Sequence, residues 1–359
     1  VCSSDLSFFM LSCSWLPGPL VDALSGATSV LSPDGNSLFH QTPEHSMKPG
    51  SLEVMGEVEK PGKIRHKDYY KREVVLRQAR RDQSSGEVVF DGAYRYRGYS
   101  LFDLLHGFQQ DKKNRDIFRP AIDLYILVEN DAGESVVFSF SEIFHVQNPH
   151  QVLIATESAP IVPYRVEVDY PVNEYWTLVS AQDLFAHRML ENPSRIRVLS
   201  FDEKEYTINR DLDPLYSPFI NVVMASGHDS GQETLLQQID ASMAGDKPVR
   251  YYHHFYGMGM GNHPTPWFEG PRLEDVLENT PDGFDPEWNR HGLLCFAGID
   301  GYRAVFSHSE LFNRTDQVSA LLAIPGNPEN GGHFRIFHPG DFYADRSVKS
   351  VGEIYFFMP

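Results

Sequence analysis

The chain has 359 residues, of which 41% are apolar, 13% aromatic and 22% charged, as is ordinary for a folded protein with a substantial core. Its formal net charge of −18 argues against nucleic-acid binding, because phosphate contacts require clustered Lys and Arg side chains. No apolar run is long enough to predict a transmembrane segment. The length favours about two domains.

The cysteines are Cys2, Cys13 and Cys295, too scattered for a disulfide framework or a cysteine-rich metal site. Cys295 lies in an apolar segment, which predicts a buried and inert thiol. Residues 7–14 resemble the end of a bacterial lipoprotein signal, in which Cys13 would carry the lipid anchor. We therefore expect an exported protein of the periplasm or outer cell envelope; the alternative is a leader without structure.

The first half is predicted to consist mostly of strands. Residues 1–50, rich in Ser, Pro and Gly, predict a leader and linker. Strands are predicted at residues 51–59, 73–76, 87–90, 124–128, 135–140 and 195–199. Short helices are predicted over 101–108, with Ser100 as N-cap, and from 141 onward. A turn at 130–133 joins two of the strands into a hairpin.

The second half repeats the pattern of the first. Residues 137–144 return as 305–312, and 98–105 correspond to 270–277. Two weaker matches follow in the same order, 153–155 with 322–324 and 188–190 with 346–348. A repeat this long indicates a duplicated globular domain rather than a solenoid. We predict a β-rich α+β fold with a leader at 1–50, a first domain at 51–203 and a second at 204–359.

These elements resemble the sulfite-oxidase-type molybdopterin-binding domain. The family's Gly-x-x-Leu-x-Asp-x-Leu helix start is matched at Gly98 and Gly270, and its Asp-Gly-Tyr hairpin at 300–302. The resemblance implies two tandem mixed-sheet domains, an oxidoreductase class and a molybdopterin cofactor. It also implies that Arg80 and Arg81, which echo a basic pair of the family, contact the pterin phosphate. A solvated basic turn is the alternative.

The sequence departs from the family at the metal ligand. Family members bind molybdenum through a cysteine ahead of the Gly-x-x-Leu-x-Asp helix, but residues 74–81 and 251–263 contain none. The resemblance therefore implies an oxidoreductase-family protein that is degenerate at its molybdenum site, with a ligand- or metal-binding crevice in the second domain. The alternative is a non-catalytic binding or scaffold protein of the cell envelope. No catalytic residue is assigned.

Residues 251–267 form an unusual stretch rich in aromatic residues, His, Met and Gly. One reading is a metal site, with copper favoured because thioethers bind Cu(I); its ligands would be His254, Met258, Met260 and His263. A second reading is a flat cofactor such as a pterin, bound by Tyr252, Tyr256, Gly257, Gly259, Gly261 and Trp267. A third is an aromatic strand and a flexible loop without a ligand. The partner would be a small-molecule ligand or a redox protein.

Overall fold

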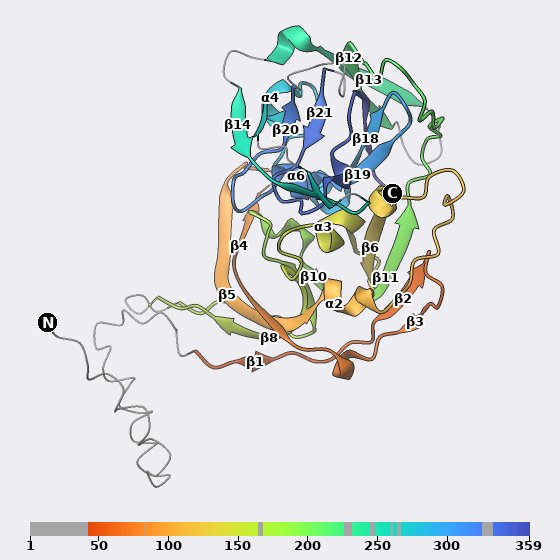
Figure 1. The fold of residues 1–359 in the computed structure, drawn as a ribbon. Coiled ribbons are helices and arrows are strands. Elements are labelled where there is room, and N and C mark those ends of the chain that lie inside the picture. The colour runs from red at the N-terminus through yellow and green to blue at the C-terminus, as the bar shows by residue number, and fades with distance from the viewer. Residues whose placement is uncertain are drawn as a thin grey trace, which may run out of the picture.

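The computed structural model contains two β-rich halves (Figure 1). It describes residues 42–82, 84–163, 168–225, 232–244, 248–259, 261–263, 267–324 and 333–359. Cys2 and Cys13 lie outside these ranges, and so does the lipid anchor expected at Cys13. Among the described residues, no helix is both long and apolar enough to cross a membrane.

The first half contains two sheets. The central sheet has the order β3-β2-β11-β6-β7 and consists of β2 (Glu53–Gly56), β3 (Gly62–Lys63), β6 (Leu124–Asn130), β7 (Ser135–Ser139) and β11 (Pro193–Ser200). The outer sheet has the order β10-β9-β8-β5-β4, with β1 also paired to β8. Its strands are β1 (His45–Ser46), β4 (Arg72–Arg81), β5 (Val88–Ser100), β8 (Val152–Pro160), β9 (Thr177–Ser180) and β10 (Leu190–Glu191).

The second half has a central sheet and three strand pairs. The central sheet, β13-β12-β22-β18-β19, consists of β12 (Phe219–Ala225), β13 (Glu233–Asp240), β18 (Leu293–Gly298), β19 (Arg303–Ser307) and β22 (Val351–Phe357). The pairs are β14 (Val249–Tyr252) with β17 (Trp267–Gly270), β15 (Phe255–Gly257) with β16 (Gly261–His263), and β20 (Leu321–Ala323) with β21 (Arg335–Phe337).

Short helices connect these strands. The α-helices are α2 (Leu101–His106), α3 (Phe140–Phe144), α4 (Leu273–Val276), α5 (Pro286–His291) and α6 (His308–Phe312). The 3-10 helices are η2 (His66–Asp68), η3 (Ala121–Asp123), η4 (Ala186–Arg188), η5 (Ala241–Ala244) and η7 (Ala344–Arg346). Strands dominate and helices are short, which confirms the predicted β-rich α+β class.

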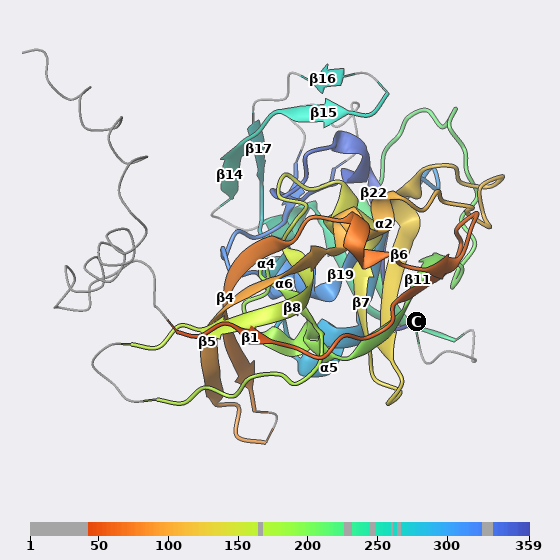
Figure 2. The ribbon, with the colours of Figure 1, turned by 90° about the horizontal axis from the view of Figure 1, so that it is seen from below.

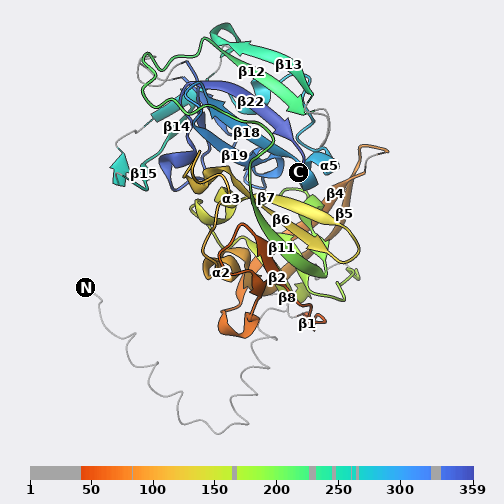
Figure 3. The same ribbon diagram turned by 90° about the vertical axis from the view of Figure 1, so that its right-hand side faces the viewer.

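The two central sheets have the same topology. In the first half, β11 pairs in parallel with β2 and antiparallel with β6, which forms a hairpin with β7. In the second half, β22 pairs in parallel with β12 and antiparallel with β18, which forms a hairpin with β19. Figure 3 shows the two sheets one above the other, with the hairpins meeting between them. That each half folds by itself, with the boundaries predicted above, stays a prediction.

The two helix starts that match in sequence also match in their packing. A Cβ added to Gly98 would lie 2.1 Å from the carbonyl oxygen of Ile154, and one added to Gly270 would lie 2.2 Å from that of Leu322. Both glycines are therefore needed for a close approach of two strands. This contact aligns Ile154 with Leu322, so the sequence match of Leu153 with Leu322 was wrong by one residue.

The helices α3 and α6 begin with the same capping box. Ser139 accepts a hydrogen bond from the backbone N–H of Glu142, whose side chain accepts one from the backbone N–H of Ser139. Ser307 and Glu310 make the same pair of bonds at α6. Each box satisfies backbone donors at a buried helix start. It also fixes the position of a buried carboxylate.

Each of these carboxylates binds a buried arginine from a later segment of the same half. Arg188 Nη1 lies 2.9 Å from Glu142 Oε1, and Arg188 Nη2 lies 2.6 Å from Asp183 Oδ1. In the second half, Arg346 bonds Glu310 at 2.9 Å and also Asp341. The fragments 180–188 and 338–346 thus repeat an Asp-x-x-Ala-x-Arg pattern.

The two networks also link the halves reciprocally. Arg188 Nη1 donates to Ser307 Oγ at 3.2 Å, and Arg346 Nη1 donates to Ser139 Oγ at 3.1 Å. The backbone follows the same rule, with Leu184 N–H bonded to Asn313 O at 2.7 Å and Phe342 N–H bonded to His145 O at 2.8 Å. The two halves therefore contact each other reciprocally, as two copies related by an approximate two-fold axis would.

Two sequence expectations differ from the structure in detail, and a third is confirmed. Residues at the end of the expected linker are packed, since His45 and Ser46 pair with β8 and Met47 is buried. The strands predicted at 73–76 and 87–90 are parts of the long β4–β5 hairpin, in which polar side chains alternate with buried tyrosines. Cys295 is fully buried, as expected, and burial raises the pKa of its thiol.

Candidate functional site

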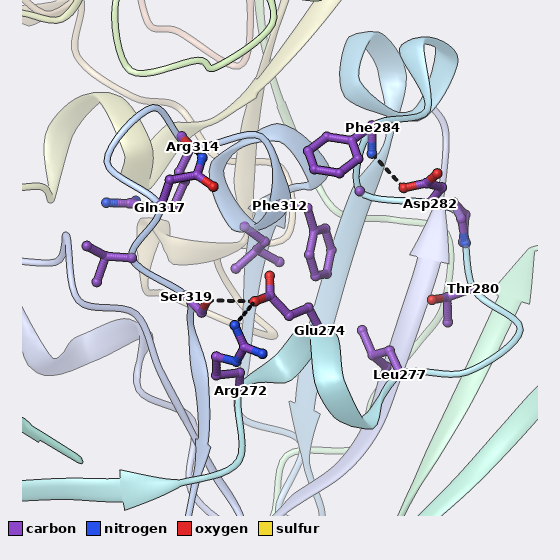
Figure 4. Close-up of a pocket in the computed structure, with 14 residues that line it drawn as sticks. Arg272, Glu274, Leu277, Thr280, Asp282, Phe284, Phe312, Arg314, Gln317 and Ser319 are labelled. Atoms are coloured by element: carbon purple, nitrogen blue, oxygen red, sulfur yellow. Dashed lines mark hydrogen bonds and ion pairs between the residues drawn. The ribbon is translucent and has the colours of Figure 1, made fainter. Parts of the chain in front are cut away.

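A cleft of about 570 Å³ lies in the second half and is here called the Arg272 cleft. It lies between the start of α4, the loop before α5 and the residues that follow α6 (Figure 4). Its lining residues are Arg272, Glu274, Leu277, Thr280, Pro281, Asp282, Gly283, Phe284, Leu311, Phe312, Arg314, Gln317, Val318 and Ser319. A volume of this size is in the range of small-molecule sites.

Arg314 lies on one wall of the cleft, and its guanidinium is hydrogen-bonded to two side chains. Its Nε donates to Asp316 Oδ1 at 2.9 Å and its Nη2 to Asp316 Oδ2, while Nη1 donates to His338 Nε2 at 2.9 Å. A guanidinium has five N–H donors, so two of them remain available, one on each terminal nitrogen. Burial alone would raise the pKa of Asp316, but the hydrogen bond and charge of Arg314 lower it.

His338 connects Arg314 to the buried arginine network. Its Nδ1 lies 2.9 Å from Asp341 Oδ1, and Asp341 also binds Arg346. Because Arg314 can only donate, His338 Nε2 must accept, and Nδ1 then donates to Asp341. Burial would raise the pKa of Asp341, but the charge of Arg346 and the hydrogen bond from His338 lower it strongly. The chain from Arg346 to Arg314 therefore orients one guanidinium toward the cleft.

A second charged group lies across the cleft from Arg314. Arg272 binds both oxygens of Asp275 at 2.7 Å, and its Nη1 lies 3.0 Å from Glu274 Oε1. Ser319 Oγ donates to the same Oε1 at 2.9 Å. Figure 4 shows Arg272, Glu274 and Ser319 together at one end and Arg314 and Gln317 at another, with Phe312 beside Glu274. The second oxygen of Glu274 has no hydrogen-bond partner among the described residues.

The arrangement can bind opposite charges on one molecule. Both arginines keep N–H donors for a carboxylate or phosphate, and Glu274 keeps an oxygen for an ammonium group. The apolar surfaces of Leu277, Phe284 and Phe312 lie beside these groups. None of the described lining residues is a Cys or His, so the cleft contains no nucleophilic thiol and no imidazole base.

The first half has a hollow at the equivalent place, here called the Phe102 pocket. Its volume is about 330 Å³, and it is lined by α2 and α3, as the Arg272 cleft is lined by α4 and α6. Leu105 and Phe144 occupy the positions of Leu277 and Phe312, but Phe102 replaces Glu274. The two halves therefore carry a polar and an apolar hollow at corresponding helices.

The predicted phosphate ligands Arg80 and Arg81 lie on β4 and not in a turn. They line a third hollow of about 450 Å³, the Arg80 hollow, together with His187, Met189 and Arg290. Arg80 binds Asp91 at 3.1 Å and Arg81 binds Asp282 at 2.8 Å. His187 is 7% exposed, and its buried Nε2 has no hydrogen-bond partner among the described residues.

The predicted aromatic cofactor residues lie on an exposed surface. Tyr252 and Trp267 are opposite each other on β14 and β17, with ring centroids 5.1 Å apart, and both are more than half exposed. Tyr256 lies on the separate β15–β16 hairpin, next to Phe342. Figure 2 shows this hairpin standing clear of the central sheets. Tyr252, Tyr256 and Trp267 line none of the three hollows described above.

The glycines of residues 251–267, namely Gly257, Gly259 and Gly261, differ in their backbone positions. Gly261 has a φ of +73° and Gly257 ends β15, while a Cβ on Gly259 would meet nothing within 4 Å. Only Gly261 among the three thus has a backbone conformation that favours glycine. Their alternation supports a tight hairpin turn, and no closely approached ligand is needed to explain it.

The predicted metal ligands are only partly described. His254 Nε2 is bonded to Tyr252 Oη at 3.0 Å, and Met258 lines the Phe102 pocket. Met260 lies outside the described residues, and of His263 only the backbone, in β16, is described. Within the described part of the chain, no group of three or more His, Cys, Asp or Glu side chains is placed to hold a metal ion.

The residues that are present do not fit a molybdenum centre of the family type. Such a centre requires a cysteine thiolate next to the cofactor, and the strands at the corresponding places, β4 and β14, carry none. Cys295, the one cysteine among the described residues, lies buried in β18 with a raised pKa, caused first by burial. It is therefore a thiol of the core and not a ligand.

Comparisons with known proteins identify no family. No protein-family model matches the chain, and no curated protein is significantly similar to it. The resemblance to the sulfite-oxidase-type domain therefore rests on the sequence motifs alone and stays an expectation.

Sequence reasoning missed the Arg272 cleft. Its two sides, 272–284 and 311–319, are separate in the chain and meet only in the fold. One sequence signal was available, namely the repeated Asp-x-x-Ala-x-Arg pattern at Asp183 and Asp341. The second copy of the pattern has His338 where the first has Ser180. The imidazole of His338 is the group that accepts a hydrogen bond from Arg314.

Proposed function

We propose that this chain is a small-molecule-binding protein on a duplicated sulfite-oxidase-type scaffold, and that it does not act through a molybdenum centre. Its ligand would be a small zwitterion, with a carboxylate or phosphate at one end and an ammonium group at the other. The Arg272 cleft would hold it. This is the non-catalytic reading of the resemblance.

The observation that carries the proposal is the fixed position of Arg314. Its guanidinium is oriented by Asp316 and by the His338–Asp341 pair, while two N–H groups remain available. Orientation before binding reduces the entropy lost when a ligand binds. A surface arginine without a ligand would need no such support from the buried interior.

The charge balance of the cleft selects the ligand class. Arg272 and Arg314 attract an anion, and Glu274 offers its second carboxylate oxygen to a cation. A doubly anionic ligand would meet Glu274 and Asp282, and a cation alone would meet two guanidinium groups. A zwitterion satisfies both kinds of charge, and the rings of Phe284 and Phe312 can cover its apolar part.

The proposal can be tested with amino acids as probes. The purified chain is screened with the standard amino acids by thermal shift, and the best ligand is measured by calorimetry. Its N-acetyl and carboxamide derivatives, which each lack one charge, are expected to bind about tenfold more weakly or worse. Glu274→Gln is expected to weaken binding similarly, whereas Glu269→Gln on exposed β17 is the control and should not. Equal binding of all three compounds would contradict the proposal.

A second candidate function is supported by the Arg80 hollow. Three arginines and the unpartnered Nε2 of His187 line it, a combination suited to a phosphate group. We propose it as a remnant phosphate contact for a pterin-type cofactor, as the resemblance implies. Inorganic phosphate titrated against the chain should bind. Each of the two single variants, Arg80→Met and Arg290→Met, should abolish that binding. Phosphate binding that both variants retain would remove this candidate.

A further inference from the structure

We infer that the Phe102 pocket is a second binding site, specific for an uncharged planar aromatic molecule. It does not depend on the function proposed for the Arg272 cleft, because different residues from different elements line it. Its polarity is the opposite of that cleft, although the fold places both hollows at equivalent positions.

The floor of the pocket is made of core residues. Val58, Leu105, Phe140 and Val198 line it, and each is at least nine-tenths buried. A hollow that reaches such residues differs from a surface depression, because the apolar area at its bottom is already surrounded by protein. A ligand that fills it removes this area and its own from water.

Aromatic rings form the walls. Phe140 and Phe144 are stacked with centroids 4.4 Å apart, and Phe102 lies 5.3 Å from Phe144 and 5.5 Å from the stacked ring of His106. Flat rings prefer offset or edge-on contacts with other rings at such distances. The pocket volume of about 330 Å³ admits a molecule of two or three aromatic rings and excludes a peptide helix.

The second half closes the pocket. Met258, from the turn between β15 and β16, and Tyr343 line it from that side. Both are held in place, since the ring of Tyr343 packs 5.6 Å from that of His145 and Met258 N–H bonds Asp345 Oδ2 at 3.2 Å. Methionine adapts to the edge of an aromatic ligand through its flexible, polarisable thioether.

The polar groups of the pocket suit one hydrogen bond and no charge. The lining contains no Asp, Glu, Lys or Arg, so an ionised ligand would lose its hydration without an ionic partner. His145 lies at the base, with Nδ1 bonded to Ser141 Oγ at 2.9 Å. Its Nε2 has no hydrogen-bond partner among the described residues, and Gln110 lies on the rim. A ring hydroxyl or ring N–H could bond to one of them.

The test uses N-phenyl-1-naphthylamine, an uncharged probe whose fluorescence rises in apolar surroundings. Added to the full chain, it should bind saturably with one site per chain. Phe102→Glu, which inserts the residue of the other hollow, should abolish this signal. Met258→Glu, at a half-exposed turn position where folding is not at risk, should weaken binding about tenfold or more. The matched controls Tyr70→Glu and Ile117→Glu, at exposed positions elsewhere, should bind the probe normally.

Three results would overturn the inference. The first is the absence of a saturable signal, and the second is unchanged binding in both Phe102→Glu and Met258→Glu. The third is displacement of the probe by tetramethylammonium chloride, since aromatic cages can also hold quaternary ammonium ions and the site would then select a cation. Displacement by uncharged indole, with no effect of tetramethylammonium, is the expected outcome.

Discussion

The Arg188 network of the first half and the Arg346 network of the second differ at one position that matters for binding. Ser180 Oγ bonds Asp183 at 2.9 Å in the first network, while His338 Nδ1 bonds Asp341 at 2.9 Å in the second. A serine ends the chain of bonds there, but an imidazole has a second nitrogen, which reaches Arg314. The comparison teaches that two halves with the same central topology can share a buried arginine network while only one of them connects it to a cleft.

The largest expected effect comes from removing the buried arginines. Arg188→Met and Arg346→Met each leave two buried carboxylates without their cation, so each should lower the free energy of unfolding by about 3–5 kcal/mol. Urea denaturation measures this, with the half-exposed Arg97→Met as the control. Similar losses in the two variants support the equivalence of the halves. Exposed ion pairs contribute under about 1 kcal/mol to stability. A loss that small in either variant would contradict the equivalence of the halves.

The second effect is a pH dependence carried by His145, whose counterpart is Asn313. Burial and then the charge of Arg346 lower the pKa of His145 to about 4. As the pH falls below about 6.5, His145 is therefore protonated in the unfolded chain but not yet in the folded one. Between about pH 6.5 and pH 4 this difference lowers the free energy of unfolding. Across this window the cost amounts to about 3 kcal/mol.

His145→Asn tests this because it inserts the residue of the other half. The variant should lose less stability than the parent chain between pH 7 and pH 4.5, as followed by urea denaturation at both values. An identical pH dependence of the two proteins would show that His145 takes up a proton as easily folded as unfolded.

The third effect concerns the paired glycines. Gly98→Ala and Gly270→Ala each place a Cβ within about 2.2 Å of a carbonyl oxygen, so the strands must move apart. Each should cost about 1–3 kcal/mol, measurable as a lower thermal midpoint. Gly133→Ala would not serve as a control because its φ is +85°, but Gly259→Ala, with open space around it, would. Tolerance of alanine at only one of the two positions would show that their packing is not equivalent.

The smallest expected effect on stability, and the most specific on binding, comes from His338→Ser. This variant gives the second half the residue of the first. It should cost about 1–2 kcal/mol of stability for a lost buried hydrogen bond, and should weaken binding in the Arg272 cleft while leaving the Phe102 pocket unchanged. Calorimetry with the amino-acid probe and fluorescence with the naphthylamine probe separate these two results.

Local patterns were enough to predict much of the fold. Ser100 predicted the start of α2 because capping is a short-range interaction, and the turn at 130–133 predicted its hairpin. The helix predicted from residue 141 onward begins one residue earlier, at Phe140, with Ser139 as its N-cap. The β15–β16 hairpin was not predicted, because Gly257, Gly259 and Gly261 suggested a loop for a ligand. The long β4–β5 hairpin was also underestimated, since its arginines made its tip look like a solvated turn.

The candidate site could not be predicted in the same way. Arg272 and Arg314 are separated by a stretch that includes α5, β18 and β19, and only the sheet order brings them to one cleft. Their support by His338 requires knowing which side chain faces which, information that no local pattern contains. The stretch 251–267 drew attention through unusual composition, yet its exposed aromatics line none of the three hollows described.

The most direct measurement for the central claim is calorimetry of the best amino-acid ligand against the parent chain and His338→Ser. If the His338–Asp341 pair orients Arg314 for a ligand, the variant should bind about tenfold more weakly while its far-ultraviolet circular dichroism stays the same. Equal affinity of the parent chain and the folded variant would contradict the account, because the connection from His338 to Arg314 would then have no part in binding.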